Sequence, residues 1–150
     1  MTLLDCISKD LIKVPMTASD KEGVIRELAH LYASFTGLGK DKEDEISAAV
    51  LAREAQGSTA LGGDIAIPHA RIDGLEKTAV VIGISRLAVD FGDEEKKGSK
   101  VFFLVLAPVD NPSEHVQVLA SIAKVCSSAL FVRMLKSSKT KEDVYNLFFE

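Results

Sequence analysis

A histidine at the end of a predicted strand is the first candidate for chemistry in this sequence. His69 follows the run Ile65–Pro68 and shares the parity of Ile65 and Ile67, so we expect its side chain to emerge at the end of a buried strand. Pro68 fixes the backbone just before it. Sites in α/β proteins gather at such sheet rims, although a histidine in an ordinary strand-to-loop turn fits this spacing equally well.

His115 and Arg53 lie on the apolar faces of two predicted helices. His115 falls in the first turn of a helix, where free N–H groups and the positive end of the dipole favour an anion. Arg53 continues an inward face and must find an anion or an acceptor there. Taken singly, each residue also has a simpler interpretation. His115 could merely flank the core, and Arg53 could be an arginine near a helix C-terminus whose side chain reaches solvent. Together with His69 they predict a site for a doubly charged phosphoryl group.

The elements that must position these residues alternate between helical and strand periods. Strands are expected at 11–16 (an edge strand), 65–67, 79–84 and 101–106, and the last two are apolar enough to be buried on both faces. Helices are expected from a Ser19–Glu22 capping box to Gly37, over 42–56, from Asn111 onward with the stripe Val116, Leu119, Ala120, Ile122 and Ala123, and over 129–135 and 141–149. The pattern predicts one α/β domain over residues 1–150, with the sheet between helices.

Composition excludes several classes of protein. The 150 residues carry 18 Lys+Arg and 22 Asp+Glu, and these basic residues are scattered, which argues against nucleic-acid binding. Cys6 and Cys126 are expected to be reduced thiols. Neither a signal peptide nor an apolar run near the ~20 residues of a membrane helix is found, so we expect a cytoplasmic protein without membrane insertion. No His or Cys pair has metal-ligand spacing, and no cofactor or metal is expected.

The segment 57–71 resembles a known active-site signature. It reads Gly57-Ser58-Thr59-Ala60-Leu61-Gly62-Gly63-Asp64-Ile65-Ala66-Ile67-Pro68-His69-Ala70-Arg71. This run is similar to the signature of the EIIA component of the phosphoenolpyruvate-dependent sugar phosphotransferase system, in the fructose/mannitol class that includes the nitrogen-regulatory EIIA proteins. The order of Arg53-Glu54, the apolar run 101–108 and His115 also matches, so the resemblance covers about residues 4–149.

The resemblance implies a fold and a histidine phosphotransferase activity. The implied fold is the EIIA type-2 (mannitol/fructose-like) fold, a mixed sheet flanked by helices. His69 would accept a phosphoryl group from phospho-HPr or from a nitrogen-branch HPr homologue. Arg53 and His115 match the family's arginine and second histidine. We expect these two residues to neutralise the phosphoryl oxygens, with help from N–H groups near Ser113 and Glu114.

The role after phosphorylation stays open between two alternatives. Sugar-transport members of the family pass the group to a cysteine of an EIIB partner, whereas a regulatory binding module controls target proteins without onward transfer. A small hydrolase with His69 as general base is a third alternative, but it lacks a nucleophile and an acid partner.

The partner surface and two departures from the family pattern complete the expectations. An apolar docking face with charged edges is expected around His69, including residues 61–67 and the helix of Arg53. Asp64 stands where many family members carry a neutral residue, and the charged run 93–97 is expected to be a solvated turn.

Overall fold

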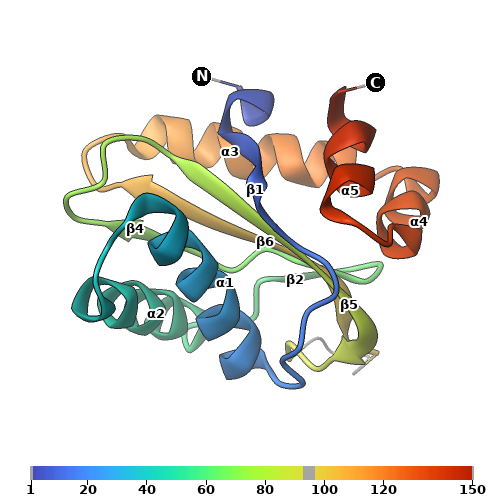
Figure 1. Cartoon of the computed structure of the whole chain (residues 1–150), viewed down its shortest axis with the longest axis horizontal. Helices are drawn as coiled ribbons and strands as arrows, with labels where there is room; N and C mark the ends of the chain where they lie inside the picture. The colour runs from blue at the N-terminus through green and yellow to red at the C-terminus, as the bar shows by residue number, and fades with distance from the viewer. Residues whose placement is uncertain (1, 93–96, 150) are drawn as a thin grey trace.

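A mixed sheet of six strands forms the centre of the computed structural model, which describes residues 2–92 and 97–149 (Figure 1). The strands are β1 (Ile7–Lys13), β2 (Ala60–Gly62), β3 (Ile65–Ala66), β4 (His69–Ile72), β5 (Ala79–Val89) and β6 (Ser99–Pro108). Their order is β1-β5-β6-β3-β2, and β4 also pairs with β6. The β5·β6 and β2·β3 pairs are antiparallel, whereas β1·β5, β3·β6 and β4·β6 are parallel.

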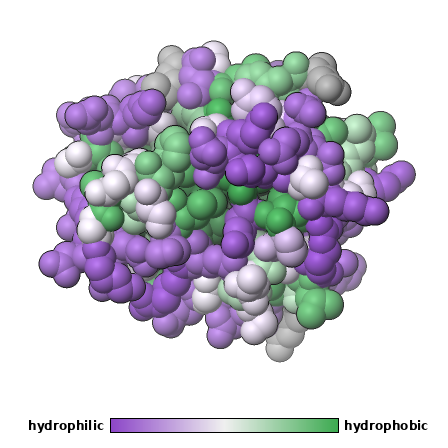
Figure 2. All heavy atoms as spheres, viewed as in Figure 1, coloured by the Kyte–Doolittle hydropathy of each residue, from purple (hydrophilic) through white to green (hydrophobic). Residues whose placement is uncertain are grey.

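Helices cover both faces of this sheet. A short 3₁₀ turn, η1 (Leu3–Cys6), precedes α1 (Lys21–Thr36), α2 (Lys40–Glu54), α3 (Pro112–Val125), α4 (Ala129–Ser137) and α5 (Lys141–Phe149). Residues of α1 and α2 pack into one apolar core, and those of α3, α4 and α5 into a second core on the other face. Figure 1 shows α1 and α2 in front of the sheet and α3 behind it. The outward face of the α1–α2 layer is largely hydrophilic (Figure 2).

The strand β6 confirms the prediction of a strand buried on both sides. Its alternate residues Phe102, Leu104 and Leu106 belong to the core under α1 and α2. Val101, Phe103 and Val105 belong to the core under α3, α4 and α5. The continuous apolar run therefore supplies one side chain to each layer in turn, which is the reason it lacks polar alternation.

Several predicted boundaries are wrong by a few residues, among them the start of α1 and the bounds of β1. Asp20, rather than Ser19, caps α1, and its carboxylate accepts from Gly23 N at 2.7 Å. The first strand is Ile7–Lys13 rather than 11–16; it does lie at the edge of the sheet, and it ends before Pro15, which has no N–H to donate. The run 93–97, predicted as a solvated turn, lies outside the described residues except for Lys97.

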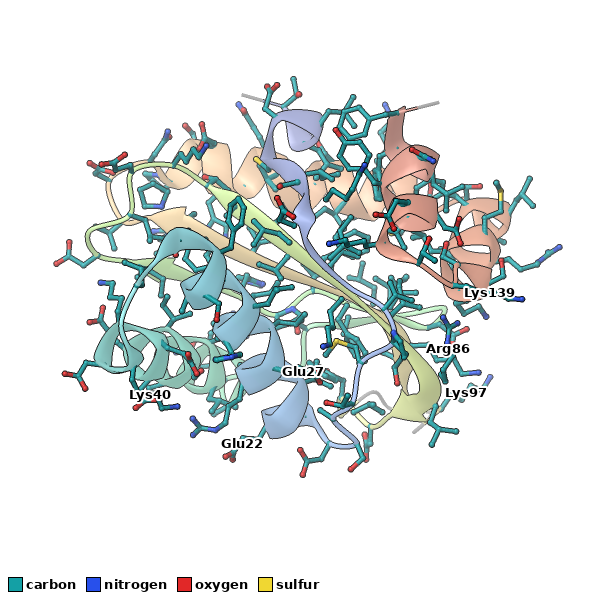
Figure 3. The ribbon with its side chains drawn as sticks, viewed as in Figure 1. Glu22, Glu27, Lys40, Arg86, Lys97 and Lys139 are labelled. Atoms are coloured by element: carbon teal, nitrogen blue, oxygen red, sulfur yellow. The ribbon has the colours of Figure 1, made fainter. Side chains whose placement is uncertain are left out.

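Hydrogen bonds from side chains to backbone groups tie the layers to the sheet. Arg86 of β5 donates hydrogen bonds to the carbonyls of Lys136 and Ser138, where α4 ends (Figure 3). Glu27 of α1 accepts from the backbone N–H groups of Thr17 and Ala18, just after β1. Among helices of the described residues, none alone has the length and hydrophobicity to span a membrane; only the bent pair of α3 and α4 meets both criteria together.

Replacing Phe102 with Ala is expected to lower the free energy of unfolding by about 3–5 kcal/mol, because this fully buried ring fills the core between β6 and Phe91. Urea denaturation followed by circular dichroism measures the change. The control is Leu87→Ala, at a side chain with 76% exposure, where a change within about 0.5 kcal/mol is expected. Equal losses in both variants would contradict this description of the core.

Candidate functional site

His69 begins a strand rather than ending one, because Pro68 interrupts the edge of the sheet. The strands before and after Pro68, β3 and β4, both pair in parallel with β6. The predicted parity is confirmed: Ile65 and Ile67 belong to the core under α3, whereas Ala70 and Ile72 belong to the core under α1 and α2. His69 and Arg71, at alternate positions of β4, therefore leave the sheet on the side of α3.

The His69 ring is held by its own chain segment. Its Nδ1 lies 2.7 Å from the carbonyl oxygen of Ile67. A carbonyl only accepts, so Nδ1 carries the proton and Nε2 is the unprotonated nitrogen of the neutral ring. Burial of the partly buried imidazole lowers its pKa from the usual value, and the charge of Arg53 acts in the same direction. The ring is therefore neutral near pH 7, with a free lone pair on Nε2.

His115 lies beside His69, as the sequence predicted, but it is more buried than expected. It occupies the first turn of α3 and is only 5% exposed. The centroids of the two imidazole rings are 5.3 Å apart, in an edge-to-face arrangement. Burial lowers the pKa of His115 to about 4, and the neighbouring His69 and Arg71 contribute. In this state His115 is a neutral group near pH 7, and it does not add a second positive charge.

Arg53 approaches His69 from the opposite layer of the molecule. It lies in the last turn of α2, and its Nη1 donates to the carbonyl of Gly57 at 2.9 Å. The buried face of α2 is Ile46, Ser47, Val50 and Glu54, so half-buried Arg53 stands beside that face rather than on it. The sheet edge at β3 and β4 lets residues from α2 and α3 meet around one imidazole.

Glu54 is a residue of the site that sequence reasoning did not single out. Its carboxylate, 4% exposed, accepts from Thr59 N at 2.9 Å and from Thr59 Oγ1 at 2.6 Å. Lys21 Nζ lies 3.7 Å away and partly balances the charge. Glu54 thereby holds segment 57–60 beside His69. The sequence does contain a sign of this role, because Glu54 lies four residues after Val50 and therefore on the buried side of α2, where a carboxylate needs a partner.

A pocket of about 440 Å³ opens beside His69. Its lining is largely apolar and comprises Arg53, Ser58, Thr59, Ala60, Leu61, Ile67, His69, Val116, Leu119, Ala120 and Ala123. The predicted stripe of α3 is confirmed at Ile122, which is buried, and at Leu119, which packs against the core. It is wrong at Val116, Ala120 and Ala123, which line this pocket instead. Val116 is 59% exposed because the helix turns its 116/120/123 edge toward this pocket instead of the core.

The N-terminus of α3 is partly occupied by its own residues. Asn111 caps the helix as predicted, with its side chain accepting from Glu114 N at 3.4 Å. The Glu114 carboxylate accepts from the Thr78 hydroxyl at 2.5 Å instead of completing a capping box. One of the two N–H groups expected to assist at the site is therefore already bonded.

Asp64, noted as a departure in the sequence, joins the β2–β3 turn to α4. It adopts a left-handed backbone conformation with φ 74° in the turn between β2 and β3. Its carboxylate pairs with Lys136 of α4 at 2.8 Å. Within residues 2–92 and 97–149, no cluster of three or more His, Cys, Asp or Glu side chains is arranged to hold a metal ion.

Comparisons with known proteins identify what this chain is similar to. Residues 5–150 match the family described as "Phosphoenolpyruvate-dependent sugar phosphotransferase system, EIIA 2". The mannitol-specific phosphotransferase enzyme IIA component of Bacillus subtilis (strain 168) is 31% identical over 149 residues, covering 98% of this chain and 99% of that protein. The nitrogen regulatory protein IIA-Ntr from Neisseria meningitidis matches with TM-score 0.87 and 25% identity over 97% of both chains.

A third match is a complex. Enzyme IIAMTL with phosphorylated enzyme IIBMTL, from Escherichia coli, matches with TM-score 0.77 and 23% identity, over 95% of this chain and 96% of the other. At that identity the likeness concerns the fold alone. The family match, the Bacillus subtilis protein and the Neisseria meningitidis structure confirm the predicted fold class and the resemblance stated for residues 57–71.

The lowered pKa of His115 predicts an acid-sensitive stability. Its pKa is about 4 when folded against 6.5 when unfolded, so the unfolded chain binds the additional proton between these values. The free energy of unfolding is expected to fall by about 3 kcal/mol through this group as pH drops from 6.5 to 4. Carboxylates titrate in the same window, so the measurement compares wild type with His115→Gln by urea denaturation at each pH. Parallel curves for the two proteins would refute the assignment.

Proposed function

The chain belongs to the EIIA 2 family of the phosphoenolpyruvate-dependent sugar phosphotransferase system, and on that premise we propose that it carries a phosphoryl group on Nε2 of His69. The donor is phospho-HPr or a nitrogen-branch homologue of HPr. The recipient is a cysteine of an EIIB partner. Residues 5–150, which match the family, act as one domain in this proposal.

The observation that carries the proposal is the hydrogen bond from His69 Nδ1 to the Ile67 carbonyl. It leaves the lone pair on Nε2, and the lowered pKa keeps the ring neutral and nucleophilic. In the transfer, Nε2 attacks phosphorus as the P–N bond to the donor histidine breaks. The electron pair of that bond returns to the donor ring, which takes up a proton from solvent, while His69 keeps its Nδ1–H.

Arg53 and His115 are proposed to bind the oxygens of the transferred group. Arg53 uses Nη1 for the Gly57 carbonyl, and a guanidinium has further N–H donors for an anion. Arg53 and His69 line the same pocket, and the charge of Arg53 lowers the pKa of His69, which supports a role for Arg53 beside the acceptor nitrogen. His115 supplies an N–H rather than a charge. Cationic and neutral donors around the equatorial oxygens stabilise phosphoryl transfer.

The apolar pocket lining supports a surface for transient protein partners. Leu61 and Val116, which line the pocket from two different elements, are 54% and 59% exposed. Arg53 and His69 line the same pocket. The prediction of a docking face at residues 61–67 is extended here by the exposed edge of α3. The complex of enzyme IIAMTL with phosphorylated enzyme IIBMTL, which shares the fold, supports an EIIB partner.

A regulatory role without onward transfer is the second candidate. The nitrogen regulatory protein IIA-Ntr from Neisseria meningitidis matches nearly all of this chain at TM-score 0.87. The acceptor chemistry at His69 is the same in both roles. They differ in whether phospho-His69 loses its group to an EIIB cysteine or persists while the protein binds its targets.

Replacing His69 with Gln is expected to abolish ³²P incorporation from phosphoenolpyruvate, enzyme I and HPr, because the attacking nitrogen is lost. The matched control is His30→Gln, at an exposed histidine that pairs with Glu43 on the α1–α2 side. The control should label at the wild-type rate, and acid-labile label should map to the peptide containing His69. Wild-type labelling of His69→Gln would disprove the acceptor.

Removing the His115 ring is expected to permit some phosphorylation but to slow onward transfer to EIIB. His115→Ala should reduce the transfer rate about tenfold or more, because a donor to an anionic oxygen is lost, and His115→Gln, which retains an amide N–H, should lose less. Rapid-quench assays on the phosphorylated proteins measure both rates.

Two results would change the proposal. Unchanged rates in both His115 variants would remove this residue from the mechanism. If wild-type phospho-protein transfers to no EIIB cysteine from the same source while His69 still labels, the regulatory role is favoured.

A further inference from the structure

Arg71 contacts the imidazole that lies beside the proposed phosphoryl acceptor. His69 and Arg71 leave β4 on the same side, two residues apart, and His115 of α3 lies next to both. Arg71 Nε is 3.4 Å from Nδ1 of His115. One short strand therefore presents a nucleophile and a guanidinium to the same buried ring.

This contact assigns the proton of His115. A guanidinium N–H only donates, so Nδ1 of His115 must offer its lone pair. A neutral imidazole has a single N–H, which then lies on Nε2. The strongly lowered pKa, to about 4, keeps the ring neutral. The tautomer follows from the hydrogen bond, and it does not depend on any phosphoryl group being present.

The assigned N–H has no partner in this state. Nε2 of His115 is buried and makes no hydrogen bond within the described residues. Buried polar atoms are nearly always satisfied, so an unsatisfied one at a site indicates a partner that arrives during function. Glu114, the acidic neighbour of His115 on α3, is already bonded to the Thr78 hydroxyl. The centroids of the His69 and His115 rings are 5.3 Å apart. A phosphoryl group on His69 would therefore bring an oxygen close to the N–H of His115.

We propose that Arg71 is a positioning residue, which holds His115 in the Nε2–H tautomer so that this N–H donates to an oxygen of the group carried by His69. The opposite tautomer would turn a lone pair toward those anionic oxygens and repel them. Arg71 acts through His115, and it is not among the residues that line the pocket beside His69. The inference rests on the proposed role of His69, but it adds a residue and a proton that the acceptor role alone does not specify.

The test is the protonation state of His115 in the unphosphorylated, full-length protein. Long-range ¹H–¹⁵N NMR on ¹⁵N-labelled protein distinguishes the two tautomers, and a pH titration gives the pKa. Wild type should show Nε2–H with a pKa near 4. Arg71→Met should shift the ring toward a mixture of tautomers and raise its pKa, because both the donor and the positive charge are lost. Because Arg71 acts through His115, onward transfer from phosphorylated Arg71→Met at pH 7 should slow by up to about the tenfold expected for His115→Ala.

Two further variants separate positioning from charge and folding. Arg71→Lys, which keeps a cationic donor, should restore the tautomer and the rate in part. Arg26→Met removes an arginine that pairs with Glu22 on exposed α1, and it should leave His115 unchanged. A wild-type His115 protonated at Nδ1, or an unaltered tautomer and pKa in Arg71→Met, would overturn the inference. If the tautomer shifts as expected but wild type never labels at His69, the proposed function fails while the pairing of Arg71 with His115 stands.

Discussion

The hydrogen bond between His69 Nδ1 and the Ile67 carbonyl determines what the rest of the site can do. It joins residues on either side of Pro68, so its geometry depends on the interruption between β3 and β4 and on the pairing of both strands with β6. The bond fixes which nitrogen is nucleophilic and limits rotation of the ring. A nucleophile held in this way loses little further freedom when it reacts, which is how a rigid scaffold lowers a transfer barrier.

The groups around that ring come from opposite layers of the molecule. Arg53 reaches it from α2, and His115 reaches it from α3, with the sheet edge between them. The relative positions of these groups depend on the sheet, because both helical layers pack against it. The double-sided apolar strands β5 and β6 provide this support, because each helical layer packs on its own set of alternate side chains.

Sequence periodicity was sufficient for the parts of the structure that depend on local spacing. The parity of His69, the Asn111 cap and the two-sided strand at 101–106 all follow from neighbouring residues, and the structure has them. The exposed edge of α3 was mistaken for its core face, since Val116 looks like a core residue unless the position of the pocket is known. Apolar residues placed for partner contact and for packing are indistinguishable in one sequence.

The polar partnerships of the site were beyond prediction because they connect separate elements. The pairing of Glu54 with Thr59 depends on how segment 57–60 folds back on α2. The neutrality of His115 depends on its burial and on Arg71, which lies on a different element. The charge states of such residues follow only from three-dimensional contacts.

Under the proposed function, the anchoring of Thr59 by buried Glu54 bears on how partners would distinguish the phosphorylated protein from the unphosphorylated one. With Thr59 bound through both its amide and its hydroxyl, the rim of the pocket has little freedom to rearrange when the anion arrives. The two forms then differ at this surface in electrostatic potential more than in contour. Partners that discriminate between them must sense that potential, and such discrimination weakens as ionic strength rises.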